Sequence, residues 1–346
     1  MTVKENINIA KCEPLLSPLE LKKELPLSEA GADRVMNNRQ AIQSILEHKD
    51  DRKMVIVGPC SIHAPNEAIE YAKKLKELSD KVADKLLVIM RVYFEKPRTT
   101  VGWKGLIYDP YLDESYKIGE GLKIARKLLL DIDELGLATA TEALDPVTTQ
   151  YIADLISWAA IGARTTESQT HRQLVSGMSM PVGFKNTTDG SIKVAIDAIC
   201  SSMHPHAFLG VLDSGLSGIF HTKGNKYAHM VLRGGSNGPN YGAEHIAFSR
   251  ELMKKASLTP NLVVDCSHAN SDKKADNQAK VLNDLVHQIN NGEESIVGVM
   301  IESNLKHGNQ KVKDIASIKP GVSITDECIG WEETEQLILN MYSSLK

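Results

Sequence analysis

Chemically active side chains follow short apolar runs throughout this sequence, and the densest group lies in the stretch Met90–Gly105. It places four cations within fourteen residues, namely Arg91, Lys96, Arg98 and Lys104. Two unit cations about 4 Å apart repel each other by roughly 4 kcal/mol at an effective dielectric constant near 20. Such a cluster is costly unless an anion binds among its members. The stretch therefore predicts an anion site, and a solvated basic loop is the alternative interpretation.

Each of the other seven apolar runs also ends in a group that binds ions, ligates metals or transfers protons. These groups are Cys60, Glu142, Arg164, Lys185, Arg233, Asp265 with His268, and Glu302. A single arginine or histidine at such a place is more often structural than functional. Eight such ends in one chain favour a shared site, because the C-terminal ends of the strands of a parallel barrel meet at one mouth.

The cations form one chemical set. Guanidinium groups bind phosphate and carboxylate through paired hydrogen bonds, and lysine supplies a point charge. The residues predicted to surround an anion with more than one charge are Arg91, Lys96, Arg164, Lys185 and Arg233. The residues predicted to form a second phosphate site are Arg98, Thr99 and Thr100.

A sulfur, an imidazole and a carboxylate form the other set, namely Cys60, His268 and Glu302. These donors suit Zn²⁺ or a divalent transition metal rather than Ca²⁺. Asp326, which follows the last strand, is the expected fourth ligand. Asp265 is expected to orient the His268 ring, provided that the fold turns its carboxylate toward the ring.

The composition restricts the class of protein. The chain has 346 residues, of which 42% are hydrophobic, and a net charge of −4. This balance excludes a general basic field for nucleic acid, and no apolar run has the length of a membrane span. The five cysteines contain no Cys-x-x-Cys pair, and residues 1–25 lack the apolar core of a signal peptide. We therefore expect a cytoplasmic protein in a reducing compartment.

Apolar runs alternate with amphipathic stretches, which is typical of parallel strands joined by helices. The predicted strands are Met54–Val57, Leu86–Met90, Leu137–Ala140, Ala159–Ala163, Val182–Phe184, His229–Leu232, Leu262–Val264 and Ile296–Ile301. The predicted helices are Asn66–Leu78, Glu114–Leu135, Thr148–Trp158, Glu167–Met178, Ser191–Ser202, Ala243–Ala256, Asp276–Asn290 and Glu332–Leu345. Eight such units without a linker predict an α/β fold, a (β/α)8 TIM barrel over residues 51–346.

Two segments lie outside the eight units. Residues 1–50 combine an arm of little periodicity at 1–25 with an amphipathic helix over Ser28–His48. Between units five and six, two apolar runs flank Asp213-Ser214-Gly215, which predicts an inserted β-hairpin at about 207–223. We expect these additions to serve oligomerisation or regulation, and a cap that stabilises the barrel is the alternative.

Long strings of residues around the strand ends match a known family. They are GPCSIH at 58–63, RVYFEKPRTT at 91–100, IGARTTES at 161–168, GFKN at 183–186, LRGG at 232–235, DCSH at 265–268, IES at 301–303 and SITD at 323–326. From about residue 30 onward, the chain resembles type I 3-deoxy-D-arabino-heptulosonate 7-phosphate (DAHP) synthases, of the feedback-regulated bacterial and fungal kind. Gln173 and Thr187 depart from the family pattern, but neither is a predicted functional residue.

The resemblance implies that the protein condenses phosphoenolpyruvate with D-erythrose 4-phosphate and water, giving DAHP and phosphate in the first step of the shikimate pathway. The residues it implies for phosphoenolpyruvate are Arg91, Lys96, Arg164, Lys185 and Arg233, with Glu142 beside the phosphate. Those it implies for the phosphate of erythrose 4-phosphate are Arg98 and Thr99. One divalent ion (Mn, Fe, Co or Zn) is expected on Cys60, His268, Glu302 and Asp326. The predicted catalytic residues are Lys96, Cys60 and His268, with Lys96 the candidate for proton transfer.

The resemblance also implies a pocket for an aromatic amino acid beside the hairpin, closed by the N-terminal arm of a neighbouring subunit in a homo-dimer or tetramer. The residues at matching positions are Pro146, Gln150, Leu174, Met178, Ser179, Phe208, Val211 and Phe220. Because this lining is largely apolar, we expect phenylalanine or tyrosine rather than tryptophan as the effector.

Three other functions fit parts of the pattern. A related synthase would use another phosphosugar such as arabinose 5-phosphate, although the string KPRTT at 96–100 favours erythrose 4-phosphate. A metal-dependent phosphate-ester hydrolase explains the metal ligands but not five cations around one end of the site. A non-enzymatic sensor of aromatic amino acids would be expected to lose metal ligands or anion-binding residues, and none is lost.

Overall fold

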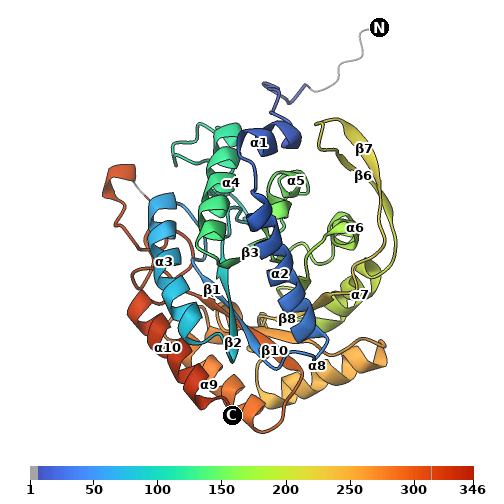
Figure 1. Ribbon diagram of the computed structural model, residues 1–346, viewed down its shortest axis with the longest axis vertical. Coiled ribbons are helices and arrows are strands. Elements are labelled where there is room, and N and C mark those ends of the chain that lie inside the picture. The colour runs from blue at the N-terminus through green and yellow to red at the C-terminus, as the bar shows by residue number, and fades with distance from the viewer. Residues whose placement is uncertain (1–6, 313) are drawn as a thin grey trace.

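Eight parallel strands close into a barrel in the computed structural model of this protein, which describes residues 7–312 and 314–346 (Figure 1). The barrel strands are β1 (Lys53–Gly58), β2 (Leu86–Arg91), β3 (Ala138–Glu142), β4 (Trp158–Ile161), β5 (Val182–Lys185), β8 (Ala228–Leu232), β9 (Leu262–Asp265) and β10 (Ile296–Glu302). Their order around the barrel is β1, β10, β9, β8, β5, β4, β3, β2. The predicted (β/α)8 barrel is confirmed, and each predicted strand boundary lies within two residues of the observed one.

The strands were recognisable because they are apolar on both faces. Along β1, Val55 and Val57 belong to the layer between the strands and the outer helices, whereas Met54 and Ile56 fill the barrel interior. A strand buried on both sides reads as a continuous apolar run. Strand β10 is the longest case, with all seven residues buried.

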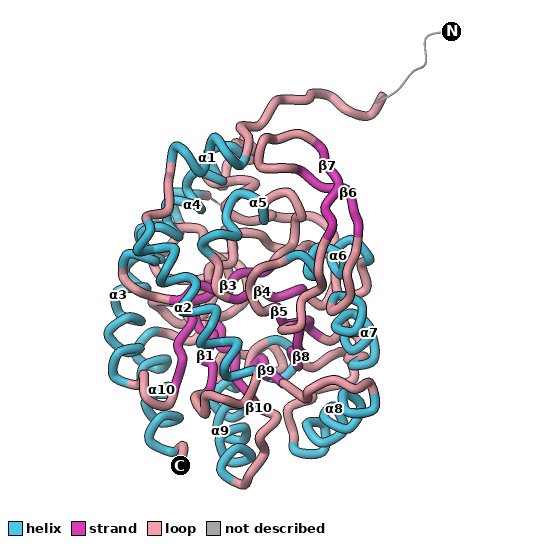
Figure 2. The backbone as a smooth tube through the Cα atoms, turned by 45° about the vertical axis from the view of Figure 1, so that its right-hand side comes forward, coloured by secondary structure: helices cyan, strands magenta, loops and turns pink. Residues whose placement is uncertain are grey.

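Helices cover the outside of the barrel (Figures 1 and 2). They are α3 (Pro65–Lys81), α4 (Ile118–Glu134), α5 (Thr149–Ile152), α6 (Gln169–Gly177), α7 (Ile192–Ser202), α8 (Ala243–Lys255), α9 (Asn277–Asn290) and α10 (Trp331–Ser344). Helix α4 begins later than the predicted Glu114, because Glu114 and Tyr116 have positive φ angles of 59° and 51°, which a right-handed helix excludes. Within the described residues, no helix is both long and apolar enough to cross a membrane.

The prediction of one helix over Thr148–Trp158 is wrong. Helix α5 ends at Ile152 and is followed by a single 3₁₀ turn, η1 (Ala153–Leu155). The chain is already extended at Ile156, and Trp158 opens β4, opposite Ala140 of β3. Trp158 fills the barrel interior, so its apolar character serves the strand rather than a helix face.

The arm predicted over residues 1–25 is partly helical, and its first six residues lie outside the described part of the chain. Helix α1 (Pro18–Glu24) begins with a capping box, in which Ser17 and Glu20 each bond the backbone N–H of the other. The turn of the predicted hairpin contacts this helix: Lys22 Nζ lies 2.8 Å from a carboxylate oxygen of Asp213.

Helix α2 (Glu29–Leu46) closes the end of the barrel at which the strands begin (Figure 2). Its residues Ile42, Ile45 and Leu46 pack with the residues that fill the barrel interior. The amide of Asn261, directly before β9, donates to the carbonyl of Leu46 at 2.8 Å. The helix is therefore part of the barrel core.

The inserted hairpin consists of β6 (Ala207–Val211) and β7 (Ser217–His221), as predicted. One face carries Phe208 opposite Phe220, whose rings stack with centroids 5.6 Å apart and planes 15° apart. The other face carries Leu209 and Ile219, which are 82% and 63% exposed. In Figures 1 and 2 the hairpin stands beside α6 and reaches toward α1, so one of its faces is turned to the barrel and the other is left open.

Candidate active site

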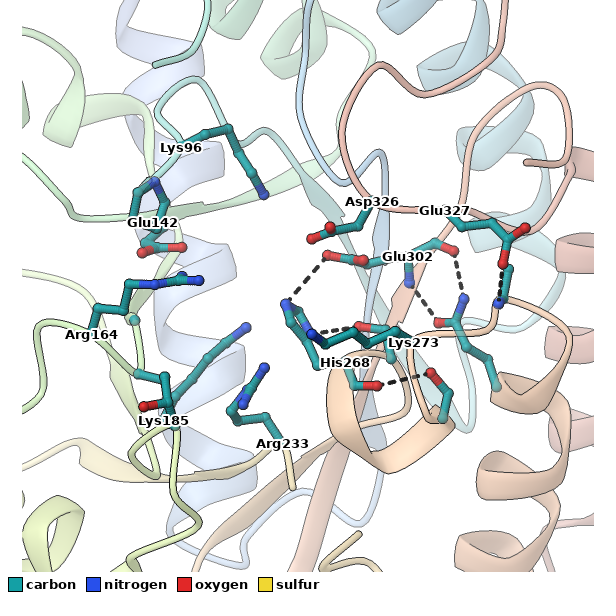
Figure 3. A pocket seen from close by; sticks show the side chains of 18 of the residues that line it. Lys96, Glu142, Arg164, Lys185, Arg233, His268, Lys273, Glu302, Asp326 and Glu327 are labelled. Carbon is teal, nitrogen blue, oxygen red and sulfur yellow. Dashed lines mark hydrogen bonds and ion pairs between the residues drawn. The ribbon is translucent and has the colours of Figure 1, made fainter. Parts of the chain in front are cut away.

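A cavity of about 360 Å³ lies where the barrel strands end (Figure 3). Strands β3, β5 and β10 end in Glu142, Lys185 and Glu302, all of which line it. Predicted residues in its wall are Lys96, Arg98, Glu142, Arg164, Lys185, Arg233, His268, Glu302 and Asp326. Cys60 and Arg91 are fully buried at its edge, in contact with Lys96 and Glu302 respectively. Thr99 is exposed and lies outside the lining.

Three of the predicted cations share one wall. Figure 3 shows Arg164, Lys185 and Arg233 pointing into the cavity opposite His268, Glu302 and Asp326. Burial lowers the pKa of Arg233, and the charge of Arg164 acts in the same direction. A bound anion would offset this effect, because its negative charge favours the charged form of Arg233.

Lys185 is held in place by an acidic partner. Its Nζ lies 3.0 Å from Asp265 Oδ2, and both side chains are buried. Burial alone would lower the pKa of Lys185, but the carboxylate of Asp265 raises it, so the lysine stays charged. The cavity therefore has a fixed ammonium group in its wall.

Arg91 lies deeper than the other cations. Its Nη2 is 3.0 Å from Glu302 Oε1, and its guanidinium carbon is 4.0 Å from the centre of the Tyr93 ring. Its Nη1 has no hydrogen-bond partner among the described residues. A buried charged N–H without an acceptor is costly, so this group suits an acceptor from a ligand.

Three predicted metal ligands come together. One donor atom each from Cys60, Glu302 and Asp326 lies within 4.8 Å of the others. The fourth, His268, has Nε2 3.9 Å from Glu302 Oε1. Burial and the charge of Glu302 raise the pKa of the Cys60 thiol to about 11. A thiol whose charged form is disfavoured beside two carboxylates fits a divalent cation, which would bind the thiolate and neutralise the set.

The His268 ring is oriented as expected. Its Nδ1 lies 2.9 Å from Asp265 Oδ2 and 2.8 Å from the hydroxyl oxygen of Ser267, which leaves Nε2 facing Glu302. The backbone of His268 has a φ of 56°, and its carbonyl accepts from the N–H of Lys273 at 2.7 Å. A left-handed histidine is strained, and such strain is concentrated at functional sites.

Lys96 lies beside the sulfur. Its Nζ is 3.1 Å from Cys60 Sγ and 3.2 Å from the Cys60 carbonyl oxygen. Burial would lower the pKa of Lys96, but Cys60, Glu302 and Asp326 together raise it. The ammonium form is therefore the stable one.

Glu142 depends on a neighbouring glycine. A Cβ atom at Gly162 would lie 2.2 Å from Glu142 Oε1, so only glycine leaves room for the carboxylate. This Oε1 is buried and has no hydrogen-bond partner in residues 7–312 and 314–346. Glu142 faces the cavity with an unused acceptor (Figure 3).

Of the three residues predicted for a second phosphate site, Arg98 lines the cavity, whereas Thr99 and Thr100 are exposed and lie outside its lining. Arg98 is also exposed, and its Nε donates to the carbonyl of Trp103 at 2.8 Å. A substrate phosphate at Arg98 would thus be separate from the wall formed by Arg164 and Arg233.

Several lining residues were not predicted from the sequence. They are Thr188, Ser271, Lys273, Lys274, Gln278, Asn309 and Glu327. Gln278 holds Glu302 in place, because its amide donates to the carbonyl and accepts from the N–H of that residue, both at 2.9 Å. The pair Lys273-Lys274 directly follows the His268 loop, and its basic character was the signal that could have revealed it.

A second cavity lies between α5, α6 and the hairpin, at the position predicted for an aromatic effector. Six of the predicted residues line it, namely Gln150, Leu174, Met178, Ser179, Phe208 and Phe220. Pro146 and Val211 lie outside its lining. The cavity is separate from the first one and shares no lining residue with it.

Known proteins match this chain over almost its entire length. The DAHP synthetase I family matches residues 30–339. The Phe-sensitive phospho-2-dehydro-3-deoxyheptonate aldolase of Escherichia coli (strain K12) is 52% identical over 99% of this chain and 97% of its own length. The Tyr-sensitive enzyme of the same strain is 49% identical over 98% and 96%. A solved structure of phospho-2-dehydro-3-deoxyheptonate aldolase from Francisella tularensis SCHU S4 superposes with a TM-score of 0.96 at 48% identity, covering 98% of each chain. The chain belongs to the DAHP synthetase I family.

Proposed function

We propose that this protein is a DAHP synthase, which joins phosphoenolpyruvate, D-erythrose 4-phosphate and water to give DAHP and inorganic phosphate. The single observation that carries the proposal is the division of one cavity into a cationic wall and an opposite wall of sulfur, imidazole and carboxylate donors. The family membership and the names of the relatives support the same reaction.

Phosphoenolpyruvate is assigned to the cationic wall. Arg164, Lys185 and Arg233 face a common space and suit its phosphate. The free Nη1 of Arg91 and the ammonium group of Lys96 suit its carboxylate. Glu142, whose Oε1 has no hydrogen-bond partner among the described residues, is assigned a place beside the phosphate, where it would orient the water that adds to the substrate.

Erythrose 4-phosphate is assigned to the mouth, with its phosphate on Arg98 and Thr99. Fixing two mutually repelling anions in one cavity replaces a bimolecular encounter with a near-attack geometry, which contributes up to about 7–11 kcal/mol of barrier lowering. Lys96 lies between the two proposed phosphate sites and is the candidate proton donor.

Cys60, His268, Glu302 and Asp326 would hold one divalent ion, for which we propose Mn, Fe, Co or Zn. When bound, such an ion supplies Lewis-acid polarisation of the aldehyde oxygen. The chain itself fixes the His268 ring through Asp265 and the Glu302 carboxylate through Arg91.

The test is an assay with purified protein, phosphoenolpyruvate, erythrose 4-phosphate and Mn²⁺, following loss of the enol absorbance and release of phosphate. Equal consumption of both substrates is expected. Phosphate release without erythrose 4-phosphate would identify a hydrolase instead. Turnover of phosphoenolpyruvate with arabinose 5-phosphate but not with erythrose 4-phosphate would identify the related synthase.

We further propose that the cavity at the hairpin binds phenylalanine or tyrosine as a feedback inhibitor. The stacked Phe208 and Phe220 supply an apolar wall, and Gln150 and Ser179 supply polar groups. An inhibitor at this cavity must favour a less active conformation, and substrate must weaken its binding to the same extent. Ser179→Phe should fill the cavity and relieve inhibition while most uninhibited activity remains.

The arm at residues 1–25 and the hairpin are proposed to serve assembly as a cytoplasmic homo-dimer or tetramer, with the arm of a neighbour closing the cavity, whereas α2 stabilises the barrel. The exposed Leu209 and Ile219 support a contact on the outer hairpin face. The free state of all five cysteines supports a reducing compartment. Deleting residues 1–25 should lower the oligomeric state measured by light scattering and relieve inhibition.

A further inference from the structure

A buried carboxyl group lies between the two cavities. Glu95 directly precedes Lys96 and is 4% exposed. Its Oε2 accepts from the Thr148 hydroxyl at 2.8 Å, and its Oε1 has no hydrogen-bond partner in the described part of the chain. Thr148 is the N-cap residue, directly before α5. This one hydrogen bond thus joins the loop of Lys96 to the helix beside the hairpin.

A small void beside this bond shares lining residues with both cavities. A void of about 10 Å³ is lined by Glu95 and Thr148, by Glu142 of the active-site cavity, and by Thr149, Met178 and Met180 of the hairpin cavity. One water needs roughly 10–15 Å³ of such volume, so the void has scarcely room for one. Because tightly packed side chains transmit a displacement rather than absorb it, movement on one side must be taken up on the other.

The charges around Glu95 are acidic. The charges of Glu142, which ends β3, and of Asp145, in the segment after it, both act against ionisation of Glu95, and Tyr108 of its own loop donates to Asp145 at 2.7 Å. Among the residues described, Glu95 has no ion pair. Burial raises the pKa of Glu95 to about 8, the Thr148 hydrogen bond opposes this shift, and the charge of Asp145 adds to it. The carboxyl group is therefore largely protonated at neutral pH.

The Thr148 hydroxyl lies within hydrogen-bond distance of two oxygen atoms. Its hydroxyl oxygen lies 2.8 Å from Glu95 Oε2 and 2.9 Å from the Asp145 carbonyl oxygen. A protonated Glu95 can donate to Thr148, which then turns its own proton to the Asp145 carbonyl. An ionised Glu95 can only accept, and it places a charge beside Asp145 and Glu142 in a space with little room for water.

We propose that Glu95 is a positioning residue whose neutral carboxyl group joins the Lys96 loop to helix α5 through Thr148, and thereby couples occupancy of the hairpin cavity to substrate binding. This inference rests on the proposed function. Glu95 acts through Thr148 on the geometry of the Lys96 loop and needs no contact with substrate.

The test measures coupling directly. The dissociation constants of phenylalanine and of tyrosine are determined by calorimetry on the full-length Mn²⁺-loaded protein, with and without saturating phosphoenolpyruvate. For each amino acid, the coupling factor is the dissociation constant with phosphoenolpyruvate divided by the constant without it. Such factors are typically about 5–150-fold. The variants are Glu95→Gln, Glu95→Ala, Thr148→Val and Thr148→Ser, with Glu114→Gln, an exposed glutamate of the same loop, as the matched control.

At pH 7, Glu95→Gln and Thr148→Ser should keep the coupling factor, whereas Glu95→Ala and Thr148→Val should reduce it to about one while the effector still binds. Between pH 7 and 9 the factor should fall in the wild type and in Glu114→Gln, and should stay constant in Glu95→Gln. A wild-type factor in Thr148→Val and Glu95→Ala, or the same pH dependence in Glu95→Gln, would overturn the proposal. A wild-type protein that binds neither amino acid would also overturn this proposal. A wild-type protein without condensation activity would overturn the proposed function itself.

Discussion

The guanidinium group of Arg91 and the carboxylate of Glu302 form an ion pair inside the barrel, with Nη2 3.0 Å from Oε1 and side-chain exposures of 0% and 2%. Arg91 is a proposed ligand of the phosphoenolpyruvate carboxylate, and Glu302 is a proposed metal ligand. The pair therefore connects the substrate site to the metal site through a single contact. Because both charges are buried, each is stabilised by the other.

Arg91→Ala should destabilise the metal-free protein by about 3–5 kcal/mol, because it leaves Glu302 buried and unpaired. The measurement is urea unfolding after treatment with a chelator, so that no bound ion compensates Glu302. Lys193→Ala is the control, since its ion pair with Asp197 is exposed and its loss should cost under about 1 kcal/mol. Equal losses for the two variants would contradict a structural role for the buried pair.

Chelation should abolish condensation, and several divalent ions should restore it, because donors of mixed softness do not select one metal strictly. Cys60→Ala should lose the ion and the activity together. Cys12→Ala should lose neither, because Cys12 is exposed and far along the chain from the other donors. Elemental analysis gives the metal content, and full activity of a metal-free sample would refute the proposed ligand set.

Arg98→Ala should raise the KM for erythrose 4-phosphate and leave phosphoenolpyruvate binding largely intact. Arg164→Ala should instead weaken phosphoenolpyruvate binding and leave the KM for erythrose 4-phosphate largely unchanged. Its cost in kcat/KM for phosphoenolpyruvate should be about 1.5–3 kcal/mol, the range for a charge-assisted hydrogen bond. Steady-state kinetics with each substrate varied in turn measures both. If either variant affected both substrates equally, the division into two phosphate sites would be wrong.

Glu95 should make stability depend on pH. Its pKa is near 4.5 when exposed, and burial raises it to about 8 in the folded protein. The folded state therefore binds the proton more tightly, so this group's contribution to stability falls as the pH rises from about 4.5 to 8, by up to about 1.4 kcal/mol per pH unit. The unfolding free energy of the wild type should fall relative to Glu95→Gln over this range, and Glu114→Gln should track the wild type. If the difference in unfolding free energy between the wild type and Glu95→Gln did not change with pH, the burial of an ionisable group at this position would be contradicted.

Gly162→Ala should impair catalysis without unfolding the barrel. The added Cβ would lie 2.2 Å from Glu142 Oε1, so the carboxylate must move away from its place in the cavity wall. A displacement of about 1 Å at a reacting group costs up to about 100-fold in rate. Gly119→Ala is the control, because its nearest neighbour would be 3.6 Å away, at Leu15. Unchanged kcat/KM in Gly162→Ala would remove Glu142 from the proposed mechanism.

The barrel could be predicted because a strand that is buried on both faces consists of a continuous apolar run. The end of the helix in the third unit could not, because Trp158 carries a bulky apolar side chain whose partners in the barrel interior are distant in sequence. The capping box at Ser17 and Glu20 was present in the sequence, yet the prediction treated that segment as an irregular arm.

By itself, the sequence determined which residues could do chemistry and that they follow the strands, since the carboxyl ends of parallel strands share one edge. The tertiary structure decided how they divide: Arg91 paired with Glu302 beneath the cavity, Arg98 at the mouth, and Lys96 against Cys60. It also decided what no local pattern encodes, that Glu95 is buried beside acidic neighbours and bonded to Thr148. Such contacts join residues that are separated along the chain, and only the packing of the whole barrel sets their distances.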